Sequence, residues 1–228
     1  MCGRFTLKTP REAITKQFGV EIDEELAPRF NITPAQSVDA IRMARAGNGR
    51  EIVRLKWGLI PSWAKDAGIA NKLINARSET LSEKPSFREA FKRRRCLVVA
   101  DGFFEWDKKG KTRRPFYFQL KNERPFAFAG LWDRWTGQDG DRVETCTIIT
   151  TTPNELLARV HDRMPVILPP EVYNTWLDED VRNTEACKEL LCPYPSSEMI
   201  SYPVGTLVNS PQHQGAELIK GVNATNSV

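Results

Sequence analysis

Short apolar runs, several of them alternating with polar residues, recur along the chain between turn-forming segments. Alternation with a period of two is typical of strands with one face in a core, and short unbroken apolar runs are typical of buried strands. Polar, glycine-containing segments at 47–49, 107–114 and 136–141 predict hairpin turns. The pattern predicts strands at residues 38–43, 52–59, 96–100, 116–120, 126–132, 143–151 and 204–209.

Helices are predicted where a serine or threonine precedes a glutamate by three residues. This spacing begins at Thr9, Ser86 and Thr152, and it is typical of a capping box, in which both side chains satisfy backbone N–H groups at a helix start. The predicted helices, including two that lack this signal, cover residues 10–18, 87–95, 153–159, 169–177 and 184–191.

Three further segments carry less regular patterns. Pro34 forces Thr33 out of the helical region, so we expect residues 29–36 to form an ordered loop. Residues 194–201 are expected to be a linker. The basic run at 92–95 is either a solvated helix end or a phosphate-binding patch, since both satisfy the charge rules.

The order of these elements favours one α+β domain. Short strands interleave with short helices, and no internal repeat, glycine-rich phosphate loop or regular βαβ alternation is present. This organisation predicts a curled, largely antiparallel, barrel-like sheet with short flanking helices. We expect the domain to span residues 1–222 and residues 223–228 to be a disordered tail.

Composition narrows the class of protein. The chain has 228 residues, of which 40% are apolar and 27% charged, with a net charge of +4. These values are typical of a globular domain, and the mildly basic balance permits a nucleic-acid partner. No apolar run approaches the roughly 20 residues of a membrane helix, and no secretory leader opens the chain, so we expect no membrane association.

Cysteine and histidine usage argues against a metal centre. Five cysteines lack disulfide-framework or zinc spacing, and two histidines are too few for a histidine-rich site. We therefore expect no metal and no cofactor. Reduced thiols are the default inside cells, so a cytoplasmic location is expected.

Cys2 carries the first candidate chemistry. Removal of Met1 is usual before a small residue and would leave an α-amine and a thiol on adjacent carbons. An aldehyde reacting with this pair gives a Schiff base, which the thiol closes to a thiazolidine. The same thiol could instead attack an amide, or Cys2 could be a chance residue in a frayed terminus.

Three other polar residues stand out. Asn75 alternates with apolar residues beside Arg77, so a strand would place both on one face, either as a solvated edge or as a ligand site. Glu105 lies among three aromatic residues, and burial there would raise its pKa and let it act as an acid. His161 follows a predicted helix and is either a proton-transfer group or a structural histidine.

The motifs around these residues resemble those of the SOS-response-associated peptidase (SRAP) family, also described as abasic-site processing proteins. The first segment reads Cys-Gly-Arg-Phe, and the fifth reads Ala-Asp-Gly-Phe-Phe-Glu-Trp. No single motif is diagnostic, but their shared order is specific. The matching segments are residues 2–5, 29–34, 57–63, 75–80, 100–106, 161–165, 208–209 and 215–219.

The resemblance implies a protein that captures abasic sites in single-stranded DNA. Cys2 is then expected to form a thiazolidine with the sugar aldehyde, and Asn75 to hold the opened sugar. Glu105 is expected to shuttle protons, while His161 aids ring opening and reversal of the crosslink. A monomer is expected, with the replication machinery as a further partner and association with the nucleoid when DNA is bound.

Several residues are expected to contact DNA. Arginine and lysine side chains would bind phosphates, and Trp63 and Pro34 would wedge against flanking bases. Trp57 and Trp63 are also compatible with a buried core. The expected DNA contacts are Arg4, Asn31, Pro34, Trp63, Lys72, Arg77 and Thr150.

Two rival functions use the same residues. In a thiol peptidase, Cys2 would be the nucleophile, His161 its base, and removal of Met1 autocatalytic. Glu105 among aromatics is better suited to acid–base work than to orienting that histidine. In a non-catalytic single-strand binding module, neither Cys2 nor Glu105 would have a role.

Overall fold

The computed structural model describes residues 2–44, 49–107, 113–178 and 184–222. Within these ranges the strands are β1 (Phe5–Leu7), β2 (Arg29–Ile32), β3 (Ser37–Met43), β4 (Arg50–Trp57), β5 (Asn75–Arg77), β6 (Arg95–Ala100), β7 (Gly102–Asp107), β8 (Arg114–Leu120), β9 (Phe126–Thr136), β10 (Arg142–Thr151), β11 (Met164–Pro165), β12 (Ile167–Leu168) and β13 (Met199–Pro203). The helices are α1 (Arg11–Phe18), α2 (Arg88–Arg93), α3 (Tyr173–Leu177) and α4 (Thr184–Glu189). Short 3₁₀ helices are η1 (Ala67–Lys72), η2 (Ser78–Thr80), η3 (Leu157–Arg159), η4 (Pro170–Val172), η5 (Ser196–Glu198), η6 (Thr206–Asn209) and η7 (Ala216–Ile219).

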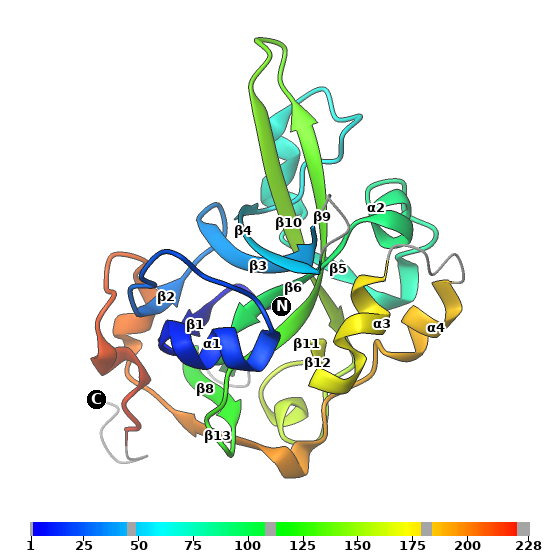
Figure 1. Ribbon diagram of the computed structural model, residues 1–228. Helices are drawn as coiled ribbons and strands as arrows, with labels where there is room; N and C mark the ends of the chain where they lie inside the picture. Colours follow the sequence, from blue (N-terminus) through cyan, green and yellow to red (C-terminus); the bar gives the residue numbers. More distant parts are fainter. Residues whose placement is uncertain (1, 45–48, 108–112, 179–183, 223–228) are drawn as a thin grey trace.

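Five strands close on themselves as a barrel-like core. They pair in the order β10-β4-β3-β6-β9, and β9 also pairs with β10. The β10 pairings with β4 and β5 are parallel, whereas the other pairings in this sheet are antiparallel. The predicted α+β domain with a curled, largely antiparallel sheet is therefore confirmed. The far halves of β9 and β10 project beyond the body as a hairpin (Figure 1).

Gly130 allows β9 to pair on both sides at the place where the barrel closes. It stands opposite Cys96 on β6 and Ile148 on β10. A Cβ atom at this position would lie 2.9 Å from the Cys96 sulfur and 3.0 Å from a Val98 methyl. A larger residue would therefore force the strands apart.

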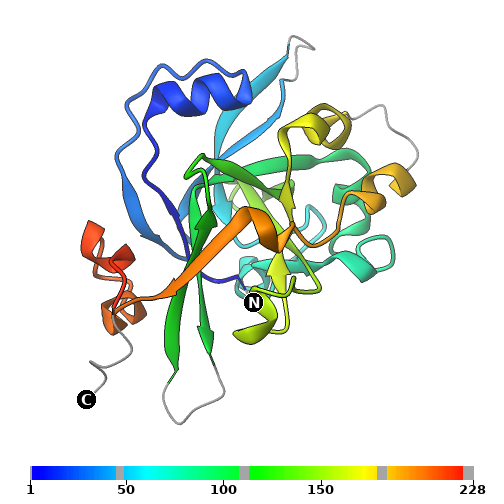
Figure 2. The same cartoon turned by 90° about the horizontal axis from the view of Figure 1, so that it is seen from below.

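A second sheet packs on the barrel and carries the start of the chain. Its order is β13-β8-β7-β1-β2, with antiparallel pairing throughout. Phe5 of β1 contacts both Trp57 and Phe128 of the barrel, with ring centroids 5.2 and 5.7 Å apart. Figure 2 shows β1 leading from the centre of the view out toward α1.

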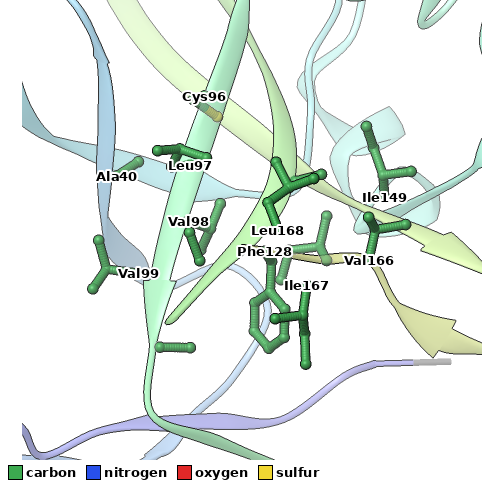
Figure 3. Packing of buried hydrophobic residues seen from close by; sticks show 14 of the residues in the cluster. Ala40, Cys96, Leu97, Val98, Val99, Phe128, Ile149, Val166, Ile167 and Leu168 are labelled. Atoms are coloured by element: carbon green, nitrogen blue, oxygen red, sulfur yellow. The ribbon is translucent and has the colours of Figure 1, made fainter. Parts of the chain in front are cut away.

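Aliphatic side chains fill the barrel interior. Figure 3 shows Val98 of β6 on the side of Phe128, Val166 and Ile167. Val98, Phe128 and Val166 are all fully buried. Among the described residues, no helix is long and apolar enough to cross a bilayer.

Two predicted irregular segments are in fact strands. Residues 29–32 of the expected loop form β2, because their backbone pairs with β1. Residues 199–203, at the end of and just beyond the expected linker, form β13 against β8. Conversely, the strand predicted at 204–209 is wrong: Val204 makes an isolated bridge and η6 follows.

The predicted capping boxes do not form. No side chain caps α1 or α2, and the Thr9 hydroxyl donates to Asp101 instead. The helix predicted at 153–159 shortens to η3, with Asn154 accepting from the Leu157 N–H at 2.9 Å. At Thr9, a hydrogen bond to the distant Asp101 outweighed the local signal.

The basic run at 92–95 is not one solvated patch. Helix α2 ends at Arg93, and Arg95 belongs to β6 with 2% exposure. Its guanidinium donates to backbone carbonyls of Phe91, Lys92, Trp176 and Asp178. Through these hydrogen bonds, Arg95 holds α2 and α3 against the barrel. The predicted turn at 47–49 and loop at 107–114 fall largely outside the described residues, and the predicted tail at 223–228 falls wholly outside them.

Candidate active site

Cys2 lies three residues before the start of β1 and is fully buried, with 0% exposure. Antiparallel pairing of β1 with β2 and β7 fixes the chain next to it. Burial, and then the nearby Glu105 carboxylate, raises the pKa of the Cys2 thiol well above its ordinary value. Cys2 is therefore a protonated thiol in an ordered position, and the alternative of a frayed terminus is wrong.

Asn75 begins β5, which pairs in parallel with β10. The predicted strand alternation holds, because Ala76 is buried while Arg77 is exposed. Asn75 Nδ2 donates to the Cys2 carbonyl at 2.8 Å. Its Oδ1 is buried and accepts no hydrogen bond from the described residues. That oxygen can accept a hydrogen bond from a bound hydroxyl beside Cys2.

Glu105 lies on β7 and is 2% exposed. Strand alternation turns it inward, toward Cys2, and this confirms the inward orientation considered from the sequence. Its Oε2 lies 3.9 Å from Nε2 of His161. A buried carboxyl group between a thiol and an imidazole is a plausible proton carrier, since each neighbour can exchange protons with it.

His161 follows η3, and its backbone N–H donates to the Leu157 carbonyl at 2.9 Å. Its ring Nδ1 lies 3.0 Å from the Arg163 N–H and 2.9 Å from an Asp162 carboxylate oxygen. One nitrogen cannot both accept from the first and donate to the second. The Asp162 side chain is 86% exposed and solvated, whereas the N–H is fixed. We therefore assign the Arg163 N–H as the partner of Nδ1, which places a ring proton on Nε2, facing Glu105.

The structure thus brings together all four residues singled out from the sequence. Cys2, Asn75, Glu105 and His161 come from the start of the chain, β5, β7 and the loop after η3. A hydrogen bond joins the first two, and Glu105 acts electrostatically on Cys2 and lies near His161. Among the described residues, no group of three or more potential ligands could hold a metal ion.

Asp101 is a supporting residue that the sequence did not single out. Its buried carboxylate accepts from the Thr6 hydroxyl at 2.6 Å and from the N–H groups of Lys8 and Thr9 at 2.6 and 2.8 Å. These bonds fix the end of β1 and so the position of Cys2. The available signal in the sequence is a lone aspartate between two apolar runs.

Glu79 and Arg163 form a second unpredicted link. The two Arg163 terminal nitrogens lie 2.6 and 2.9 Å from the Glu79 carboxylate, and one also donates to the Thr150 carbonyl at 2.6 Å. Both residues lie inside motifs noted from the sequence. Their partnership spans 84 positions, so local pattern could not reveal it.

Arg4 and Asn31, both expected to contact DNA, contact each other. Arg4 Nη1 donates to Asn31 Oδ1 at 2.7 Å and also to the Val208 carbonyl. Asn31 is fully buried and donates to the carbonyls of Ser210 and His213 at 3.0 and 2.7 Å. The Asn31 amide therefore ties down the carboxyl segment, defined as residues 204–219. A direct DNA contact of Asn31 remains a prediction, and its burial weighs against it.

The other expected DNA contacts differ in accessibility. Trp63 is 57% exposed, whereas Trp57 is a core residue with 1% exposure. Lys72 and Arg77 are exposed. Pro34 is partly buried, beside Ala35 with a left-handed φ of 69°.

Thr150 is buried, and its hydroxyl lies 3.4 Å from the Ala76 carbonyl. Trp63, Lys72 and Arg77 are therefore the contacts that the structure leaves most open to DNA.

A family model described as SOS response associated peptidase (SRAP) matches residues 1–211. The chain belongs to the SRAP family. Among its relatives, "Abasic site processing protein YoqW" of Bacillus subtilis is 44% identical over 224 residues, covering 96% of this chain and 99% of the relative. "Abasic site processing protein YedK" of Escherichia coli is 29% identical, covering 97% and 100%.

A mammalian protein and a solved structure also match most of the chain. "Abasic site processing protein HMCES" of Mus musculus is 29% identical, covering 96% of this chain and 75% of that protein. A crystal structure of a protein from Bacteroides thetaiotaomicron matches with a TM-score of 0.87 and 28% identity, covering 97% of this chain and 100% of that one.

Proposed function

We propose that this SRAP protein captures abasic sites in single-stranded DNA by forming a thiazolidine between Cys2 and the sugar aldehyde. The observation that carries the proposal is the burial of Cys2 beside Asn75, Glu105 and His161. Its relatives are named abasic site processing proteins, which supports the same substrate.

The reaction balances without a cofactor. After removal of Met1, the Cys2 α-amine adds to the C1 aldehyde and gives a carbinolamine. Loss of one water gives an imine, the thiol sulfur adds to the imine carbon, and the thiol proton ends on the nitrogen. One C–N and one C–S bond form, one water leaves, and the DNA backbone stays intact.

The side chains suit these steps. Glu105 can protonate the departing hydroxyl. It can later accept the proton of the Cys2 thiol, which would otherwise keep that proton because its pKa is raised. Asn75 Oδ1 can accept from a sugar hydroxyl. His161 can move a proton between the oxygens of the closed sugar and so open it, and the reverse path would release the DNA.

DNA would reach the site as a bent or single strand, as in enzymes that extrude their target nucleotide. Arg4, Lys72 and Arg77 are proposed as phosphate contacts, and Trp63 and Pro34 as base contacts. The same proposal has the protein act as a monomer in the cytoplasm, and on the nucleoid when DNA is bound. Replication proteins are its proposed further partners.

A thiol peptidase is supported less well. Such an enzyme needs a ready thiolate, but burial and Glu105 hold the Cys2 thiol in its protonated form. His161 Nε2, to which the ring proton is assigned above, also lies 3.9 Å from Glu105 Oε2, and a nitrogen that carries a proton cannot act as a base. Neither observation favours amide cleavage.

The test is incubation with a single-stranded oligonucleotide that carries one abasic site, followed by denaturing mass spectrometry. We expect a one-to-one adduct whose mass is the sum of both molecules less one water. Cys2→Ala or acetylation of the α-amine should abolish the adduct, whereas Cys192→Ala, at an exposed thiol, should not. An adduct formed equally well by Cys2→Ala would overturn the proposal.

A further inference from the structure

His161 sits in a short loop whose conformation depends on its neighbours. The loop joins η3 to β11, where Met164 and Pro165 pair with Thr151 and Thr150. Within it, the Arg163 peptide N–H points at His161 Nδ1 at 3.0 Å. This bond decides which ring nitrogen carries the proton. An N–H group can donate only to an unprotonated ring nitrogen, so Nδ1 must be unprotonated and the proton lies on Nε2.

The Asp162 carboxylate competes for the same nitrogen. It lies 2.9 Å from His161 Nδ1 and would favour a proton there. A small rotation of the Arg163 peptide would therefore break its hydrogen bond to Nδ1 and leave Asp162 as the hydrogen-bond partner of that nitrogen. The ring would then present Nε2 to Glu105 without its proton, or become a cation.

The Arg163 side chain holds that peptide in place. The Arg163 side chain is only 13% exposed, and its guanidinium bridges the Glu79 carboxylate and the Thr150 carbonyl. A planar guanidinium with two bonds to one carboxylate is fixed in orientation as well as position. The Arg163 hydrogen bond also keeps the pKa of Glu79 below its ordinary value, consistent with a carboxylate that stays charged.

Glu79 also lies at an informative place in the chain. It belongs to η2, which follows directly after β5, the strand that carries Asn75. The ion pair therefore ties the segment of Asn75 to the loop of His161.

We propose that Glu79 is a positioning residue for His161. By clamping Arg163, it keeps the Arg163 N–H on Nδ1, so that the imidazole presents its Nε2 proton to Glu105. This inference rests on the proposed function for its consequence, but the state of the ring can be tested without DNA.

The test follows the His161 ring nitrogens by ¹⁵N NMR in the full chain. The sequence has two histidines, so His213→Gln assigns the signals. In the wild type we expect Nδ1 at the shift of an unprotonated nitrogen. In Glu79→Ala it should move toward the protonated shift, as Asp162 takes over. Unchanged His161 shifts in Glu79→Ala would overturn the proposal.

The rate of adduct formation on abasic DNA provides the second measurement. We expect Glu79→Ala to slow it by about tenfold, within the range that misplacement of a catalytic group causes. In an Arg163→Met background, Glu79→Ala should cause no further loss. Glu89→Ala is the matched control, since Glu89 pairs with Lys92 on α2 and is 54% exposed, against 49% for Glu79.

The two measurements separate this inference from the proposed function. If the wild type forms no adduct, the proposed function fails, while the nitrogen shifts still decide whether Glu79 sets the His161 ring. If the shifts change in Glu79→Ala but the adduct rate does not, Glu79 sets the ring without serving the reaction, and the positioning role is overturned.

Discussion

Cys2 and Glu105 place a protonated thiol beside a buried carboxyl group, so one substitution should have opposite effects on two reactions of the same sulfur. Simple alkylation needs the thiolate, whereas thiazolidine closure needs a group that removes the thiol proton at the right moment. Glu105 discourages the first through its charge and is proposed to assist the second.

Glu105→Gln should therefore speed alkylation of Cys2 by iodoacetamide at pH 9 and slow its reaction with abasic DNA. Loss of the negative charge lowers the thiol pKa, and each unit is about a tenfold change in thiolate. Mass spectrometry of the Cys2 peptide gives the first rate. Alkylation that is equally fast in both proteins would show that the carboxyl group does not act on the sulfur.

At the scale of elements, β1 depends on a single carboxylate. Asp101 accepts hydrogen bonds from Thr6, Lys8 and Thr9, and Gly102 next to it lets β7 pass Tyr117. A Cβ at residue 102 would lie 2.0 Å from the Tyr117 hydroxyl. The Asp-Gly pair therefore shapes the strand crossing that orders Cys2.

Asp101→Ala should lower the free energy of unfolding by about 3 kcal/mol, because it leaves buried donors without a charged acceptor. Urea denaturation measures this loss. Asp66→Ala is a suitable comparison, since Asp66 accepts one bond from the exposed Gly68 N–H, and its cost should stay near 1 kcal/mol. Equal losses in the two variants would contradict the anchoring role.

The sequence predicted elements well where the apolar pattern reports the core directly. Strands β3, β6, β8, β9 and β10 follow that pattern because large apolar side chains face the barrel. β2 and β13 were missed, since edge strands bury little and form through backbone pairing. The capping boxes failed for Thr9 because Asp101, far along the chain, offers its hydroxyl a charged acceptor.

The candidate site was predictable to the same extent. Cys2, Asn75, Glu105 and His161 were found because their chemistry is unusual for their surroundings. Asp101, Glu79 and Arg163 were not, since each acts through a partner distant in sequence. Asn31 was expected at DNA, but its full burial gives it a contact with the carboxyl segment.

For the whole molecule, buried thiols link stability to pH. Burial raises the pKa values of Cys2, Cys96 and Cys146 well above those of exposed thiols. The unfolded chain loses these protons near pH 8.5, while the folded protein keeps them. The contribution of the three buried thiols to the free energy of unfolding is therefore fully present below about pH 8.5 and declines as the pH rises above it.

The free energy of unfolding should accordingly fall between pH 8.5 and 10, by about 1.4 kcal/mol per pH unit for each thiol. Urea titrations with reductant present would measure the slope. Cys146→Ala should reduce the slope by about 1.4 kcal/mol per pH unit, the share of one thiol. Cys192→Ser, at an exposed position, should leave the slope unchanged. A flat profile would refute the linkage.

DNA binding should also depend on the overall charge distribution. Each phosphate contact on single-stranded DNA contributes about 0.7 to the slope of log affinity against log salt. Arg77→Ala should reduce that slope by about this amount in noncovalent binding to undamaged DNA. Lys16→Ala, on α1, should leave it unchanged; equal effects would remove Arg77 from the contact surface.

The hydrogen bond from Arg4 to the Val208 carbonyl joins the amino-terminal segment to the carboxyl segment. Leu207, immediately before it, is 50% exposed and open to proteases. A cut there would detach the acceptors that hold Arg4 and Asn31, close to the reactive cysteine. A preparation in which some molecules are cut at Leu207 should therefore contain molecules whose Cys2 reacts at different rates, even when every molecule carries an intact Cys2.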